Sequence, residues 1–270
     1  MSDPNARFDG SIPEIYDRHL GPLLFEPYAR DLARRVERVA PRRVLELACG
    51  TGIATQQLRE VLPASTELVA TDLNEAMIAH ARTRLNGSAG LTWRQADACA
   101  LPFAAGEFDM IVCQFGFMFV PDKPTAAREA RRVLVTGGRV LLSVWDTLEH
   151  NPLGRIAHAT IASFFPANPP DFYQVPYGYA DRTAIAGVFR EAGFTDVEFE
   201  TLALEAVSLS ARHAAFGLVH GNPVAAAIRE RGVSDTQPIV DALALALEQV
   251  GGSAPFRVPS RAIIVAATAS

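Results

Sequence analysis

The strongest structural signal in the chain is Arg43-Val44-Leu45-Glu46-Leu47-Ala48-Cys49-Gly50-Thr51-Gly52-Ile53-Ala54-Thr55. Its first residues form a short apolar run that predicts a buried strand, and the glycines predict a turn into a helix. Glycine at positions 50 and 52 lets the backbone approach a ligand where a Cβ would clash. Glu46 lies inside the predicted strand. Thr55 stands where the dinucleotide-binding fingerprint has its third glycine, so that fingerprint is incomplete.

Three later predicted strands also end in residues that could contact a ligand. An apolar run ends in Asp72, twenty residues after Gly52, where a carboxylate can accept hydrogen bonds from ribose hydroxyls. A third strand leads into Asp97-Ala98, and a fourth ends in Gln114-Phe115. Because the carboxyl ends of parallel strands meet at one edge of a sheet, these residues are expected to surround one ligand.

These four strand ends together resemble the cofactor site of class I S-adenosylmethionine-dependent methyltransferases, most closely the ubiquinone/menaquinone-type branch that acts on small molecules. The resemblance covers about residues 40–146. It implies S-adenosylmethionine as the cofactor, with its amino-acid end in the glycine loop, its ribose on Asp72 and its adenine near Asp97. It also implies an aromatic side chain that folds over the cofactor, for which Tyr16 and Tyr28 are candidates. The expected cofactor-binding residues are Tyr16, Glu46, Ala48, Gly50, Gly52, Asp72, Leu73, Met77, Asp97, Ala98, Gln114 and Phe115.

The order of elements predicts an α/β fold, because strand and helix patterns alternate. With the resemblance, we expect a Rossmann-like, seven-stranded, mostly parallel sheet with an antiparallel last strand, helices on both faces and helical cap insertions. The expected strands are 43–48, 67–71, 91–95, 108–114, 138–145, 197–209 and 257–268. The expected helices of the basic plan are 12–20, 22–39, 53–61, 74–84, 123–135 and 181–192. Pro22 suits a helix start, and Gly137-Gly138 suggests a break before the fifth strand.

Two segments exceed this plan, namely residues 147–180 and residues 210–254. The first is rich in proline and aromatic residues, and the second predicts three helices. We expect residues 1–40 to contribute N-terminal helices to a cap, and residues 41–270 to form the methyltransferase domain with these two insertions. A cap at the carboxyl edge of the sheet would cover the site. The alternatives are padding of the fold or a homodimer contact.

The catalytic group is not identifiable from the sequence. The sulfonium is already an activated methyl donor, so positioning is the main task, and an acceptor that is already nucleophilic needs no base. Candidate bases are His150, His220, His19 and Tyr177, with Asp146 as a further carboxylate. Aromatic residues after the fourth and fifth strands favour an apolar or aromatic small-molecule acceptor, with the methylated atom left open. No metal-ligating constellation is expected.

Composition excludes several classes of function. A formal net charge of −5 gives no electrostatic footprint for nucleic acid. No apolar run approaches the length of a membrane span, and no secretory signal pattern is present, so a cytoplasmic protein is expected. The 3 cysteines have no metal-ligand spacing.

Three other functions remain open at this point. A nicotinamide-dependent oxidoreductase shares Gly50-x-Gly52 and Asp72, although that class does not require Glu46 or Asp97. A protein that binds S-adenosylmethionine without turnover is compatible with the same residues. An RNA methyltransferase is disfavoured by the acidic balance and by Gln114-Phe115-Gly116-Phe117, which stands where such enzymes carry an Asn-Pro-Pro-Tyr type motif.

Overall fold

A single seven-stranded sheet organises the computed structural model, which describes Phe8, Gly10 and residues 12–270. The strand order is β3-β2-β1-β4-β5-β7-β6. The strands are β1 (Arg43–Glu46), β2 (Glu67–Asp72), β3 (Leu91–Gln95), β4 (Phe108–Gln114), β5 (Leu134–Trp145), β6 (Phe194–Ser208) and β7 (Phe256–Ala269). The first five pair in parallel, whereas β7 runs antiparallel to both β5 and β6. The expected Rossmann-like fold is therefore confirmed.

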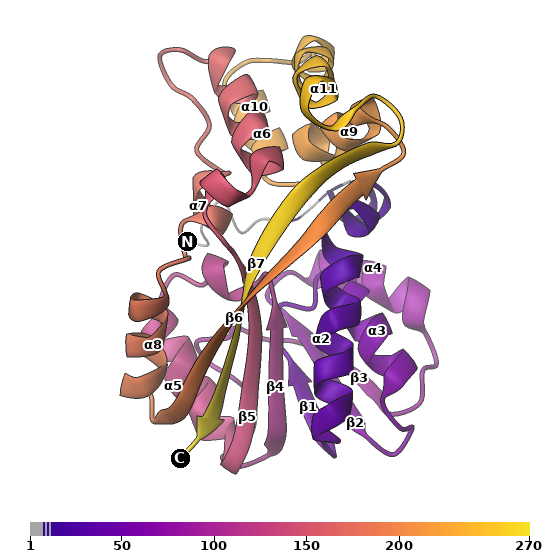
Figure 1. Ribbon diagram of the computed structural model, residues 1–270. Coiled ribbons are helices and arrows are strands. Elements are labelled where there is room, and N and C mark those ends of the chain that lie inside the picture. Colours follow the sequence, from indigo (N-terminus) through magenta and orange to yellow (C-terminus); the bar gives the residue numbers. More distant parts are fainter. Residues whose placement is uncertain (1–7, 9, 11) are drawn as a thin grey trace.

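Helices surround this sheet, as Figure 1 shows. The helices of the basic plan are α2 (Glu26–Val39), α3 (Ile53–Val61), α4 (Glu75–Leu85), α5 (Lys123–Val133) and α8 (Arg182–Glu191). Strand β4 is buried along almost its whole length, because a parallel strand in the middle of the sheet is covered on both faces. Strand β6, at the sheet edge, has many exposed and half-buried residues instead.

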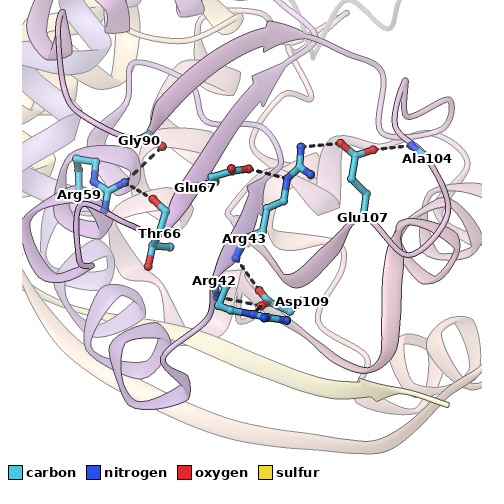
Figure 2. Close-up of polar contacts among 9 residues, drawn as sticks. All are labelled: Arg42, Arg43, Arg59, Thr66, Glu67, Gly90, Ala104, Glu107 and Asp109. Atoms are coloured by element: carbon cyan, nitrogen blue, oxygen red, sulfur yellow. Dashed lines mark hydrogen bonds and ion pairs between the residues drawn. The ribbon is translucent and has the colours of Figure 1, made fainter.

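Polar contacts hold the amino ends of the strands, as Figure 2 shows. Asp109 at the start of β4 accepts hydrogen bonds from the backbone N–H groups of Arg42 at 2.9 Å and Arg43 at 3.0 Å. The Arg43 guanidinium joins Glu107 at 2.8 Å and Glu67 at 3.1 Å. These contacts satisfy backbone donors at this end. The opposite, carboxyl end of the sheet carries the residues that the sequence predicts to bind the cofactor.

The N-terminal helices differ from the expectation. The chain stays helical from α1 (Ile12–Ile15) through the π-helix η2 (Tyr16–Phe25) into α2, without a break at Pro22. The N–H of Glu26 donates to the carbonyl of Gly21, five residues back, so a wide π-turn accommodates the proline. Gly21 does not end a helix. A Cβ there would lie 3.2 Å from Ile53 Cδ1, so its small size allows η2 to pack on α3.

The fifth strand also differs, because it begins at Leu134 and runs through Gly137 and Gly138. Its register against β4 shifts between Phe108 and Met110. Gly137 has a φ of +79°, which glycine adopts without penalty. The two glycines therefore form an irregularity inside the strand, and the predicted break is wrong.

Both insertions lie beyond the carboxyl ends of the parallel strands (Figure 1). The first contains η4 (Leu148–His150), α6 (Pro152–Ser163) and α7 (Gln174–Tyr177). The second contains α9 (Ala211–His220), α10 (Val224–Glu230) and α11 (Gln237–Gly251), close to the three expected helices. The long strands β6 and β7 extend to these helices. One continuous cluster of buried apolar side chains includes Leu45 and Ile111 of the sheet and Leu218 and Leu243 of the second insertion.

Candidate functional site

A cavity of about 560 Å³ opens where the carboxyl ends of β1, β2, β3 and β4 meet. The strand order reverses between β1 and β4, which is where open α/β sheets bind ligands. The cavity is lined by Phe8, Tyr16, Leu47, Ala48, Gly50, Thr71, Asp72, Leu73, Asn74, Met77, Ala96, Asp97, Ala98, Gln114, Phe115, Gly116, Phe119, Val120 and Pro121. Ten of the twelve residues expected to bind the cofactor are in this set, and the other two are Glu46 and Gly52.

The glycine loop is shaped by two residues with left-handed backbone conformations. Ala48 has a φ of 54° and Gly50 a φ of 55°. The N–H of Gly50 donates to Asp72 Oδ2 at 2.9 Å, so β2 holds the loop directly. A Cβ added at Gly50 would have no atom closer than Met77 Cε at 4.0 Å, and would therefore extend into open space beside the cavity.

Gly52 has a different role from the one that the sequence suggested. A Cβ added there would lie 3.0 Å from Ala81 Cβ and 3.3 Å from both Leu85 Cδ1 and Trp93 Cη2. These atoms belong to α4 and β3, so Gly52 allows close packing behind the loop. It lines neither the cavity nor the smaller void beside it. The expectation that Gly52 makes room for a ligand is therefore replaced by a packing role.

Asp72 ends β2 with its side chain buried. Oδ1 accepts a hydrogen bond from the N–H of Asn74 at 2.8 Å, and Oδ2 accepts the one from Gly50. Burial raises the pKa of Asp72, and the backbone hydrogen bonds from Asn74 and Gly50 oppose that rise. Oδ1 also accepts a hydrogen bond from Asn74 Nδ2 at 3.3 Å, so the remaining acceptor position is on Oδ2. Asp72 therefore both fixes the loop and can bind a hydroxyl.

A small void of about 30 Å³ adjoins the cavity behind Tyr16. Two buried acceptor atoms at this void, Glu46 Oε2 and Gln114 Oε1, have no hydrogen-bond partner within the described part of the chain. Burial raises the pKa of Glu46 to about 8, and the neighbouring Asp72 adds to the rise. Buried acceptors rarely remain unpaired. The void is large enough for a water molecule or an ammonium group, and both of these donate hydrogen bonds.

Aromatic side chains form the opposite wall. Tyr16 stacks on Phe25 with ring centroids 4.7 Å apart, and Phe8 meets Tyr16 edge-on at 5.9 Å. Phe119 lies 6.2 Å from Phe8. Burial is the largest cause of a raised pKa of Tyr16, so its hydroxyl stays protonated. Tyr28, the other candidate aromatic, is buried behind this wall and hydrogen-bonds Ser260 Oγ at 2.8 Å, so it does not reach the cavity.

The aromatic residues of the sequence analysis thus divide into two groups. Phe115 and Phe119 line the cavity, whereas Trp145 lies behind Phe115, with the rings stacked 3.8 Å apart. Phe115 has a φ of 54°, an uncommon conformation for an aromatic residue. The sequence missed Phe8 and Pro121, which belong to no recognisable motif. Gly116 was also missed as a site residue. A Cβ there would lie 2.2 Å from Ala48 Cβ.

The candidate bases do not line the cavity. His19 faces away from it, with its ring 4.1 Å from that of His213 in α9. His220 pairs with Thr236 Oγ1 at 3.2 Å, and burial lowers the pKa of all three histidines. His150 is exposed on η4.

The remaining two candidates also have structural surroundings. Tyr177 is buried, and its ring occupies the space beside Gly154. Asp146 accepts a hydrogen bond from Arg261 Nε at 2.6 Å. Within residues 8, 10 and 12–270, no group of His, Cys, Asp and Glu side chains has the geometry of a metal site.

Comparison with known proteins identifies the family. A family model described as "Methyltransferase domain" matches residues 44–138, which include the glycine loop, Asp72, Asp97 and Gln114. The ubiquinone/menaquinone biosynthesis C-methyltransferase UbiE of Proteus mirabilis is 32% identical over 174 residues, covering 60% of this chain and 69% of that protein. The chain belongs to the class I S-adenosylmethionine-dependent methyltransferases, in the ubiquinone/menaquinone-type branch.

Other relatives agree with this methyltransferase assignment. UbiE of Cellvibrio japonicus is 33% identical over 174 residues, covering 59% of this chain and 70% of that protein. Among solved structures, the YcgJ protein of Bacillus subtilis superposes with a TM-score of 0.58 at 19% identity, covering 90% of this chain and 98% of that one. Phosphoethanolamine N-methyltransferase 2 of Haemonchus contortus, in complex with phosphomonomethylethanolamine and S-adenosylhomocysteine, superposes with a TM-score of 0.59 at 17% sequence identity. That match covers 95% of this chain and 57% of the other. At such identities the structures support the fold alone.

The protein is thus a methyltransferase that uses S-adenosylmethionine on a small-molecule acceptor, and nothing supports the oxidoreductase alternative. Among the described residues, none of the helices is both long enough and apolar enough to cross a bilayer.

Proposed function

We propose that the methyltransferase binds its cofactor along the carboxyl edge of the sheet, with the amino-acid end at Glu46 and Gln114. The supporting observation is the pair of buried acceptor atoms without partners beside the small void. An ammonium group donates hydrogen bonds and carries the charge that an ionised Glu46 requires. Gly50 leaves the space in which the cofactor can pass close to the backbone.

The other contacts follow from the order of strand ends. Asp72 would accept a hydrogen bond from a ribose hydroxyl, since Oδ2 accepts only the one from Gly50 and keeps a further acceptor position. Asp97 and the N–H of Ala98 would meet the adenine edge, with Leu73 and Met77 beside the ring. When bound, the cofactor supplies an activated methyl group on a sulfonium. Tyr16 and Phe115 would lie beside that group, where ring faces attract a cation.

We propose an uncharged, apolar or aromatic acceptor. The wall beside the expected methyl position includes Phe8, Tyr16, Phe115, Phe119, Val120 and Pro121. Among the residues that the structure describes, the carboxylates on the cavity are Asp72 and Asp97. Among residues 8, 10 and 12–270, no lysine, arginine or histidine lines it. An anionic acceptor would lose hydration without gaining a cationic partner among these residues, and the two carboxylates are already assigned to the cofactor. The same lining and the net charge of −5 argue against a nucleic-acid acceptor.

Catalysis would then depend on the relative position of the methyl group and the acceptor, and on the exclusion of water, rather than on a base. We propose that the two insertions and the N-terminal helices act as a cap that supports the aromatic wall from outside. Phe172 of the first insertion stacks on Phe119 with ring centroids 6.2 Å apart. His19 of η2 packs on His213 of α9. No residue of either insertion lines the cavity itself.

Matched acceptor pairs test this assignment. S-adenosylmethionine is incubated with the protein and a substituted phenol, hydroquinone or indole, each beside its carboxylated or sulfonated analogue. Formation of S-adenosylhomocysteine is followed by mass spectrometry, with Asp72→Ala as the control for cofactor dependence. We expect turnover only among the neutral compounds. Faster methylation of the charged analogues would contradict the proposed acceptor class.

A further inference from the structure

One carboxylate joins the N-terminal helices to the cofactor site. Asp17, in η2, accepts hydrogen bonds at Oδ1 from Thr51 Oγ1, 3.1 Å away, and from Arg84 Nη1. Its Oδ2 lies 3.5 Å from His80 Nε2. Thr51 belongs to the glycine loop, whereas His80 and Arg84 belong to α4. Arg84 also donates to Gln56 Oε1 on α3 at 2.8 Å.

This contact lies next to the residue that covers the cavity. Tyr16 directly precedes Asp17 and lines both the cavity and the small void. At the other end of η2, the carbonyl of Phe25 accepts a hydrogen bond from Gln114 Nε2 at 3.1 Å. Polar contacts therefore hold η2 at both ends over the place where the amino-acid end of the cofactor is proposed to bind.

The passage between the two spaces depends on η2. The void and the cavity share Tyr16, Ala48, Gly50 and Gln114 among their lining residues. Ala48, Gly50 and Gln114 belong to the glycine loop and the sheet. Of the four shared residues, Tyr16 is therefore the one that η2 contributes. A shift of η2 away from α4 would widen the passage to Glu46, and such a shift must first separate Asp17 from Arg84 and Thr51.

The Asp17 contact is shielded more than an ordinary surface ion pair. The Asp17 side chain is 21% exposed and that of Arg84 is 32% exposed, whereas Glu75 and Arg82, a pair on the same helix α4, are 50% and 47% exposed. Charge–charge contacts weaken with exposure to solvent. The Glu75–Arg82 contact stays within α4 and does not reach η2.

We propose that Asp17 is a positioning residue that latches η2 over the cofactor cavity and thereby limits the rate at which cofactor and product exchange. The proposal rests on the proposed binding of the cofactor's amino-acid end beside Glu46. Asp17 need not touch the cofactor. It acts through Thr51 on the glycine loop and through its neighbour Tyr16 on the cavity wall.

The test compares dissociation rates of S-adenosylhomocysteine from the wild type, Asp17→Asn, Arg84→Gln and the double variant by stopped-flow displacement. We expect each single variant to release the product about tenfold faster, since the lost hydrogen bond joins two charged groups that are partly shielded from solvent. The double variant should add little, because the Asp17–Arg84 contact is already lost in each single variant. Arg82→Gln is the matched control on α4 and should dissociate like the wild type.

Two further readouts separate a latch from a general loss of stability. Added salt should speed dissociation from the wild type more than from Asp17→Asn, because only the wild type has the ion pair to screen. The KM for S-adenosylmethionine should rise in the variants without a fall in kcat. Unchanged dissociation rates in variants of a wild type that binds S-adenosylhomocysteine would overturn the latch alone. A wild type that does not bind it would overturn the proposed site as well.

Discussion

At the scale of single residues, Asp72 has two tasks that one substitution removes together. Its carboxylate holds the glycine loop through the N–H of Gly50 and is proposed to bind the ribose. We expect Asp72→Ala to weaken binding of S-adenosylhomocysteine about ten- to a hundredfold, because hydrogen bonds to a charged group are worth roughly 1.5–3 kcal/mol. Titration calorimetry on the folded variant measures this. An unchanged affinity would mean that Asp72 is not at the cofactor site.

Glu46 gives a prediction about pH. In the free protein its pKa is raised to about 8, so the carboxyl is largely protonated at neutral pH. An ammonium group beside it favours the ionised form, so binding should release a proton. The affinity for S-adenosylhomocysteine should then rise by up to about tenfold per pH unit between pH 6 and 8.

Calorimetry in two buffers with different ionisation enthalpies counts the released proton directly. In Glu46→Gln the affinity should be lower and its pH dependence in this range should largely disappear. A wild-type affinity that is the same at pH 6 and pH 8 would refute the pairing of Glu46 with an ammonium group.

At the scale of the element, the two glycines of the loop should respond differently to alanine. Both have positive φ, so each substitution should cost about 1–2 kcal/mol of stability from the backbone alone. At Gly52 the Cβ also meets Ala81, Leu85 and Trp93, so Gly52→Ala should unfold more easily while keeping its cofactor affinity once folded. At Gly50 the Cβ meets open space, so Gly50→Ala should lose mainly affinity. Thermal denaturation measures the stability of both variants, and calorimetry measures their cofactor affinity. A larger loss of stability at Gly50 and a larger loss of affinity at Gly52 would contradict the packing described for the loop.

The same loop illustrates how far the sequence allows prediction. Strand ends such as Asp72 and Gln114 could be predicted, because apolar runs and polar residues at their ends reflect local rules. The role of Gly52 could not, since it depends on side chains that α4 and β3 bring from later in the chain. The continuous helix through Pro22 and the strand through Gly137 were missed for a related reason. A π-turn and a strand irregularity contain the same residues that usually signal a break.

The candidate bases show the same limit at the site. Histidines near predicted strand ends or on cap segments suggested catalysis, but the sequence does not say which way each side chain points. His19 and His220 face structural partners, and the cavity wall instead includes Phe8, which belongs to no motif.

At the scale of the whole molecule, the cofactor is proposed to lie between the sheet edge and η2, with the insertions supporting that arrangement from outside. The family match ends at residue 138, before either insertion begins. The most direct test is hydrogen exchange with and without S-adenosylhomocysteine. We expect increased protection in η2 around Tyr16, in residues 48–52 and in residues 72–77, with residues 210–254 nearly unchanged. Protection gained in residues 210–254 while the glycine loop and η2 stay unchanged would contradict the proposed site.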